Sequence, residues 1–201
     1  MAAGPGFQLQ LQPKEEPAKA KGAKVSVKSL REKAGTYLSK PVGMVLRLEE
    51  KDGKLQRVDR DGSAQALLAL ADNRFRFEPY PIELEFDGTG EQRVVKVRFG
   101  DQKPTTLQRV PAVTPSAAEL NDYVGLFASE ELDARYRTQV TDGKLQVATL
   151  KSDSLELAPV TKDVFAGEFG TVTFARDGNG RVNGFSLSTG RAWNNEFAKL
   201  E

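Results

Sequence analysis

Short stretches in which apolar and polar residues alternate recur along most of the chain. In Ile82–Phe86 three apolar side chains alternate with two glutamates, and Val94–Phe99 continues in the same way. Alternation with a period of two is typical of strands that bury one face. Asp-Gly pairs such as Asp52-Gly53 separate many of these stretches and indicate hairpin turns. The pattern predicts an all-β protein made of short antiparallel strands.

The chain carries this pattern twice, at a spacing of ninety residues. Ser29–Ser39 resembles Glu119–Ser129 without a gap, and Gly35 matches Gly125. An identical Asp-Gly-Lys-Leu-Gln sequence then occurs in both copies. Self-similarity at a fixed period indicates one supersecondary unit used twice. A constant offset further predicts that Phe75 matches Phe165, Ile82 matches Val172 and Leu84 matches Phe174.

The two copies divide the chain into three parts. We expect an N-terminal strand and linker over residues 1–25, a first β-barrel over 26–112 and a second β-barrel over 113–201. Phe7–Gln12 alternates and favours an extra edge strand, whereas Pro13–Lys24 lacks large apolar side chains and favours a linker. About eight strands in each unit would leave many edges to protect, which favours closure into eight-stranded barrels.

Each barrel is expected to be entered by a short helix. The two helices are predicted at Ser29–Ala34 and Ser116–Tyr123, and the second starts with a capping-box pattern. Ala64–Leu70 is rich in helix formers, but its counterpart Ser154–Val160 alternates and contains a proline. A helix interior does not tolerate proline, so we expect strands at both places.

Composition excludes several functional classes. The chain has 29 basic and 28 acidic residues, so no net field attracts nucleic acid or an acidic substrate. It has no cysteine and no histidine, which removes thiolate zinc sites, cysteine nucleophiles and most hydrolase triads. We expect no metal and no cofactor. No apolar run reaches the roughly 18 residues of a membrane helix, so we expect no membrane span.

Five motifs of the second copy together resemble a known module. They are Tyr123-Val-Gly-Leu-Phe127, Asp142-Gly-Lys-Leu145, Leu157-Ala-Pro-Val160, Asp163-Val-Phe165 and Val172-Thr-Phe174-Ala-Arg-Asp-Gly178. In these motifs the chain resembles the C-terminal β-barrel domains of β-lactamase-related serine hydrolases, a family that includes D-aminopeptidases and penicillin-binding-like proteins. The resemblance covers Ser26–Leu200 as two copies, and the first departs from it with Lys33 in place of the leading tyrosine.

The resemblance implies two lipocalin-like, eight-stranded antiparallel barrels that carry no catalytic residues. It implies an accessory module of a serine hydrolase that shapes substrate access or mediates contact between domains or subunits. The implied partner is a catalytic domain or chain of the Ser-x-x-Lys type, and self-association into a homo-oligomer is a further expectation. In this family a loop from one barrel can reach the active site and restrict the substrates that enter. Family members are commonly exported in bacteria, which implies a periplasmic or secreted location.

The chain itself lacks the catalytic motifs of that family. No serine is followed by a lysine three positions later, and no Tyr-x-Asn sequence is present. Ser188-Thr-Gly190 lacks the lysine or histidine of the third motif. We therefore expect no catalytic residue here.

Two acidic patterns are better explained by structure than by chemistry. Glu83 and Glu85 are spaced like a carboxylate pair, but alternation places both on the outer face of a strand. Asp177–Gly180 begins like a calcium loop, but the later glycine and glutamate of such a loop are missing. We expect a solvated strand face and a hairpin turn.

An aromatic set in the second copy is a candidate lining for a ligand cavity. Its members are Tyr136, Phe165, Phe174, Phe185 and Trp193. Eight-stranded barrels can hold one small apolar molecule, although core packing is the favoured interpretation of these rings. A ligand cavity would make the chain a free-standing lipocalin-like carrier of a small apolar ligand, which is the main alternative to an accessory module.

Overall fold

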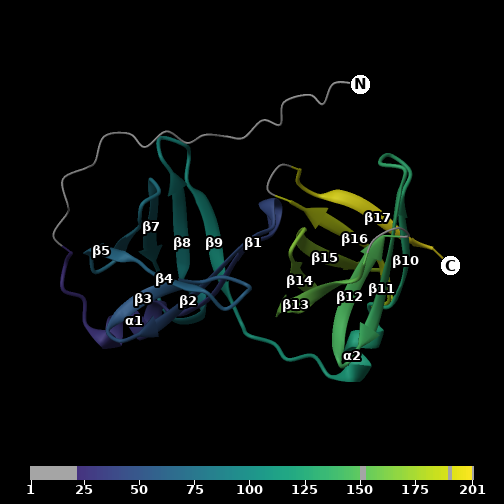
Figure 1. The fold of residues 1–201 in the computed structure, drawn as a ribbon, viewed down its shortest axis with the longest axis horizontal. Helices are drawn as coiled ribbons and strands as arrows, with labels where there is room; N and C mark the ends of the chain where they lie inside the picture. Colours follow the sequence, from purple (N-terminus) through teal and green to yellow (C-terminus); the bar gives the residue numbers. More distant parts are fainter. Residues whose placement is uncertain (1–21, 150–152, 190–191, 201) are drawn as a thin grey trace.

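The structure, a computed structural model, describes residues 22–149, 153–189 and 192–200, which form two antiparallel β-sheets side by side (Figure 1). We call the first sheet barrel 1 and the second barrel 2. This arrangement confirms the predicted all-β fold of tandem barrels. The extra strand predicted at Phe7–Gln12 lies outside the described residues, as does most of the predicted linker.

The elements of barrel 1 are α1 (Val27–Lys33), β1 (Gly35–Ser39), the 3-10 turn η1 (Lys40–Val42), β2 (Met44–Lys51), β3 (Lys54–Val58), β4 (Ala64–Ala66), β5 (Leu68–Ala71), β6 (Arg74–Phe77), β7 (Ile82–Asp87), the 3-10 turn η2 (Gly90–Gln92), β8 (Val94–Phe99) and β9 (Thr105–Val110). Barrel 2 contains α2 (Ala117–Asn121), β10 (Gly125–Ser129), β11 (Ala134–Thr141), β12 (Lys144–Thr149), β13 (Leu155–Thr161), β14 (Val164–Gly167), β15 (Gly170–Arg176), β16 (Val182–Ser188) and β17 (Asn195–Leu200). No helix within these described ranges is long and apolar enough to cross a membrane.

Barrel 2 is closed, whereas barrel 1 is nearly closed. In barrel 2 the last strand, β17, pairs with the first, β10. Barrel 1 is a nine-stranded sheet whose edge strands, β4 and β5, are separated only by Leu67. The amide of Leu67 still donates to the carbonyl of Leu55 at 2.8 Å. The strand predicted at Ala64–Leu70 is therefore present but divided, whereas its counterpart β13 is continuous.

The ninety-residue repeat is visible in the strands, with one shift. Gly35 and Gly125 each begin the first strand of their barrel. Phe75 pairs with Leu84, and its counterpart Phe165 pairs with Val172. Leu84 therefore corresponds to Val172, and its predicted match with Phe174 was wrong. The reason is loop length, because four residues (78–81) join β6 to β7 but only two (168–169) join β14 to β15.

Each barrel has its own hydrophobic core, formed by the inward-facing residues of its strands. The core of barrel 1 includes Leu30, Tyr37, Leu48, Leu55, Phe75, Leu84, Phe86, Val95 and Leu107, and that of barrel 2 includes Leu120, Tyr123, Phe127, Leu145, Leu157, Phe165, Val172, Phe174, Phe185 and Phe197. The helices α1 and α2 contribute Leu30 and Leu120 and so cover one end of each barrel.

Equivalent residues fill the helix end of the two barrels, but they differ in type and in the hydrogen bonds that they form. In barrel 2 the Tyr123 hydroxyl donates to Asp163 at 2.9 Å. In barrel 1 this position is Lys33, whose ammonium donates to Ser29 Oγ at 2.6 Å and to Asp72 at 3.4 Å. Asp163 lies in the turn before β14, and Asp72 lies in the equivalent turn before β6. The first copy thus has a cation in place of the tyrosine of the second copy and keeps an acidic partner.

The raised pKa values of two buried tyrosines predict that the free energy of unfolding falls in alkaline solution. Burial raises the pKa of Tyr37 and Tyr123, and the hydrogen bond to Asp163 raises the pKa of Tyr123 further. Such groups stabilise the fold fully below the unfolded pKa, about 10 for tyrosine, and less as pH rises through the folded pKa. Urea unfolding from about pH 8 to about pH 11 should show this loss. The double variant Tyr37→Phe, Tyr123→Phe should lose less stability, and an unchanged slope would contradict the prediction.

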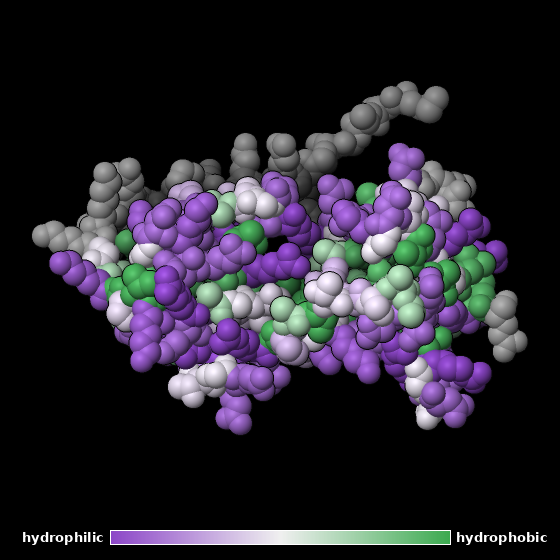
Figure 2. Space-filling view, turned by 90° about the horizontal axis from the view of Figure 1, so that it is seen from below, coloured by the Kyte–Doolittle hydropathy of each residue, from purple (hydrophilic) through white to green (hydrophobic). Residues whose placement is uncertain are grey.

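The two barrels pack against each other through their outer faces. Leu38 of barrel 1 forms an apolar cluster with Val160, Val164 and Ala166 of barrel 2. The turn after β1 also reaches barrel 2, where the Thr171 hydroxyl donates to the carbonyl of Gly43 at 2.7 Å (Figure 1). On the face drawn in Figure 2, hydrophilic residues dominate barrel 1, while hydrophobic residues emerge over barrel 2 and at the junction. The junction therefore combines apolar packing with a hydrogen bond from a side chain to a backbone carbonyl.

Candidate functional site

The predicted aromatic set is divided between the core of barrel 2 and its surface. Phe165, Phe174 and Phe185 are buried and in ring contact, with centroids 5.7 Å apart in both the Phe165–Phe174 and Phe174–Phe185 pairs. Tyr136 packs beside them, 6.1 Å from the Phe185 ring. Trp193 is 61% exposed, so its predicted place in the interior was wrong. It lies in the connection between β16 and β17, where strand alternation does not orient side chains.

The acidic patterns occupy the structural positions expected for them. Glu83 lies on the outer face of barrel 1, where Arg76 binds it at 3.0 Å and Arg74 at 3.1 Å. The hydrogen bond from Arg76 is the main reason that the pKa of Glu83 is lowered. Glu85 is exposed on the same strand, and Asp177 accepts the amide of Asn179 at 2.9 Å within a hairpin turn. Across the parts of the chain that are described, no acidic group has the grouping needed to hold a metal ion.

A serine and a lysine do lie together in barrel 1, at a spacing of four rather than three. Lys33 donates to Ser29 Oγ, and Ser29 in turn donates to Asp72 at 2.7 Å. A nucleophilic serine needs a base that accepts its proton, but here lysine is the donor and aspartate the acceptor. The cluster therefore fills the end of the barrel and lacks the arrangement of a Ser-Lys dyad, in which lysine accepts the serine proton.

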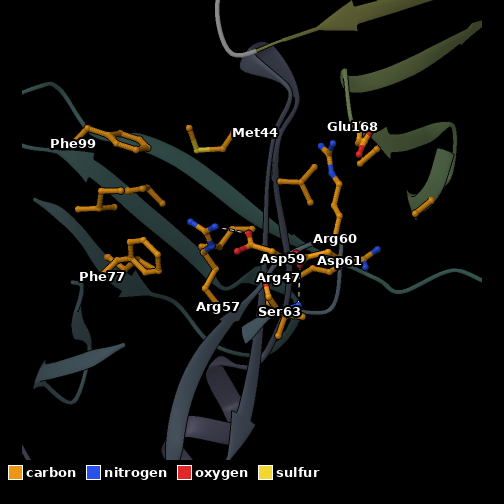
Figure 3. Close-up of a pocket in the computed structure, with 18 residues that line it drawn as sticks. Met44, Arg47, Arg57, Asp59, Arg60, Asp61, Ser63, Phe77, Phe99 and Glu168 are labelled. Atoms are coloured by element: carbon orange, nitrogen blue, oxygen red, sulfur yellow. Dashed lines mark hydrogen bonds and ion pairs between the residues drawn. The ribbon is translucent and has the colours of Figure 1, made fainter. Parts of the chain in front are cut away.

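A cavity of about 640 Å³ opens at the opposite end of barrel 1, beside the junction with barrel 2 (Figure 3). We call it the mouth cavity. Its lining comprises Met44, Val45, Leu46, Arg47, Arg57, Val58, Asp59, Arg60, Asp61, Ser63, Phe77, Ile82, Leu84, Val97 and Phe99 of barrel 1 and Ala158, Ala166 and Glu168 of barrel 2. It is thus built by both barrels, although barrel 1 supplies most of the wall.

The mouth cavity exists because β2 and β3 separate early. β2 pairs with β3 only over Leu48–Lys51, whereas the equivalent pairing of β11 with β12 extends over Tyr136–Thr141. After Val58 the chain leaves the sheet as the loop 59–63, which we call the mouth loop. The amide of Asp59 donates to the carbonyl of Ser63 at 2.8 Å, so this loop is a compact turn.

The floor of the mouth cavity is apolar. Leu84 and Val97 are core residues of barrel 1, and Met44, Leu46 and Ile82 lie partly buried above them. Phe77 is already covered, because Tyr80 stacks on it at 5.7 Å and the Arg57 guanidinium lies 4.5 Å from its ring centroid. The other apolar side chains, together with Phe99 at the rim, remain available to contact a ligand.

Three arginines and three carboxylates surround the opening. Arg57 forms an ion pair with Asp59, and Asp61 accepts the amide of Ser63 at 2.9 Å. Arg47 donates to the carbonyl of Pro159 at 3.3 Å. The remaining cation, Arg60, extends from the mouth loop toward Glu168 of barrel 2 (Figure 3).

The environment of Arg60 combines partial burial with a like charge. Partial removal from water lowers the pKa of this solvent-accessible arginine most, Arg47 lowers it further, and Glu168 raises it. A guanidinium group nevertheless remains protonated in proteins. Within the described residues, no carboxylate lies within ion-pair distance of Arg60. Arg47 and Arg60 are therefore neighbouring cations, and Glu168 is a more distant acidic neighbour of Arg60.

The mouth cavity was not predicted from the sequence, although the repeat contains a signal for it. Asp59 and Arg60 stand where the second copy has Thr149 and a leucine. Thr149 is the last residue of β12, so a charge at the matching position indicates that β3 ends earlier.

The motifs behind the family resemblance mostly serve the fold. Tyr123 plugs barrel 2, Phe127 is fully buried in its core, and Asp142 has a φ of 52° in the turn between β11 and β12. These three residues are not part of the mouth cavity. Comparison with known proteins found no family model and no curated protein that matches this chain.

Proposed function

We propose that this chain is a non-catalytic binding module that holds a small amphipathic ligand in the mouth cavity of barrel 1. The observation that carries this proposal is a cavity of about 640 Å³ with an apolar floor and arginines on its rim. Small-molecule sites are commonly of this size, mostly apolar, with a few polar groups, and barrel mouths are a frequent location. The sequence suggested a carrier function for barrel 2, and the cavity moves that idea to barrel 1.

Barrel 2 has a supporting role in this proposal. Its aromatic core is packed with its own rings, and β11 and β12 stay paired where β2 and β3 separate. Its outer face supplies Ala158, Ala166 and Glu168 to the wall of the mouth cavity. The second copy of the repeat would thus complete the binding site of the first.

Fluorescence titration with the amphipathic, anionic dye 1-anilinonaphthalene-8-sulfonate tests the binding function. We expect saturable binding at one site. Met44→Trp should fill the cavity and weaken binding by about tenfold, which corresponds to about 1.4 kcal/mol. The control Leu132→Trp adds the same ring at an exposed position in barrel 2 and should leave the affinity unchanged. Binding that does not saturate, or that both variants weaken equally, would refute the proposal.

A second candidate function is an accessory module of a β-lactamase-related serine hydrolase. The projecting mouth loop favours it, because in that family a barrel loop can restrict access to the active site of a separate catalytic domain. Affinity capture from the source cell, followed by mass spectrometry, should then recover a protein with a Ser-x-x-Lys motif. Deletion of residues 60–62 should change the substrate range of the recovered enzyme, and an unchanged range would count against this role.

A further inference from the structure

We infer that the ligand of the mouth cavity is an amphipathic monoanion, an organic carboxylate whose acid group binds between Arg47 and Arg60. This inference rests on the proposed binding function of the same cavity. It names the chemical class of the ligand and assigns Glu168 a role in specificity.

Two of the three arginines at the opening have no ion-pair partner in the described part of the chain. Asp59 is paired with Arg57, whereas Asp61 accepts the neutral amide of Ser63 and keeps its negative charge. Arg47 and Arg60 form no ion pair among the described residues, although the six charged groups of the lining sum to zero. A ligand with one negative charge would pair with these two arginines directly.

Arg47 and Arg60 come from different elements of barrel 1 and reach the same opening. Arg47 lies on β2 and Arg60 on the mouth loop, and both line the same cavity. Two cations held near each other without an intervening anion repel, and a carboxylate placed between them relieves that repulsion. Guanidinium groups also bind carboxylates through two parallel hydrogen bonds, which gives charge and orientation together.

The apolar floor of the mouth cavity would bind the rest of the ligand. An acid group at the rim places the remainder of the molecule toward Met44, Leu46 and Ile82, which form the exposed part of the apolar floor. Phe99, 37% exposed at the rim, can cover the chain where it leaves the acid group. This arrangement fits an aliphatic or aromatic body attached to one carboxylate.

Glu168 would determine which anions the mouth cavity prefers. It comes from barrel 2, faces Arg60 across the opening, and is the acidic residue that raises the pKa of that arginine. It therefore competes with a ligand for Arg60 and would repel a second negative charge. Glu168 should lower the affinity for every anion and should disfavour dianions more than monoanions.

Calorimetric titration with three probes of equal chain length tests the inference. The probes are octanoate, octanol and octyltrimethylammonium. We expect octanoate to bind about tenfold more tightly than octanol and the cation to bind most weakly. Arg60→Gln and Arg47→Gln should each remove most of this preference without changing octanol binding. Glu168→Gln should tighten octanoate binding by about threefold.

Two further variants make the outcome specific. Arg181→Gln removes a highly exposed arginine from barrel 2 and should leave all three affinities unchanged. Arg60→Lys keeps the charge but loses the planar fork, so it should keep only part of the preference. Equal affinity for octanoate and octanol would overturn this inference and leave the binding function standing. Absence of binding by all three probes would overturn both.

Discussion

Replacing Phe174 with alanine should lower the free energy of unfolding of barrel 2 by about 3 to 5 kcal/mol. The side chain is 4% exposed, and its ring lies 4.7 Å from that of Tyr123 and 5.7 Å from those of Phe165 and Phe185. Removing it would leave a void among rings that are attached to β14, β16 and the segment before β10 of a closed barrel. The hydrogen-bonded wall prevents these strands from moving inward, so the void would not close.

Urea unfolding followed by far-UV circular dichroism measures this loss. Trp193→Ala is the matched control, because it also removes a large aromatic ring from barrel 2 but from an exposed position. Its effect should stay within about 0.5 kcal/mol. Because the barrels have separate cores, Phe174→Ala should also split unfolding into an early transition of barrel 2 and a later one of barrel 1. A loss from Trp193→Ala as large as that from Phe174→Ala would contradict the packing described above.

The barrel fold could be predicted because alternation and repetition are local properties of the sequence. Inward positions such as Phe75 and Phe165 are identified by the alternation within their own strands. The repeat adds a second sequence against which each predicted strand can be checked. Prediction failed where loops intervene. The longer loop at 78–81 shifted the match of Leu84, and Trp193 lies in a connection where alternation carries no information.

The mouth cavity could not be predicted in the same way, because it depends on contacts between distant parts of the chain. Arg60 and Glu168 face each other only because the barrels pack through Leu38, Val160 and Val164. No periodicity in a sequence reports how two finished barrels dock. The earlier end of β3 is marked in the sequence, because Asp59 stands where the other copy has Thr149, the last residue of β12.

Gly43→Ala should disrupt the docking of the two barrels while leaving each barrel folded. Gly43 follows η1 and has a φ of 62°, a left-handed conformation that glycine adopts freely. A Cβ atom at this position would lie 2.3 Å from Cβ of Ser188 and 3.3 Å from Cβ of Thr171, both in barrel 2. Ser188 cannot swing away, because its Cβ is fixed to a strand. The η1 turn must therefore move out of its contact, and the hydrogen bond from Thr171 to the Gly43 carbonyl would be lost.

Gly53→Ala separates this clash from simple backbone strain. Gly53 has a similar φ of 71°, in the turn between β2 and β3, and no atom lies near its added Cβ. Both substitutions share the cost of a left-handed alanine, about 1 to 2 kcal/mol. Gly43→Ala should cost about 1 to 3 kcal/mol more, as for other overpacked contacts. Small-angle X-ray scattering should show a larger radius of gyration for Gly43→Ala than for Gly53→Ala. Equal radii and equal unfolding free energies would mean that η1 does not hold the barrels together.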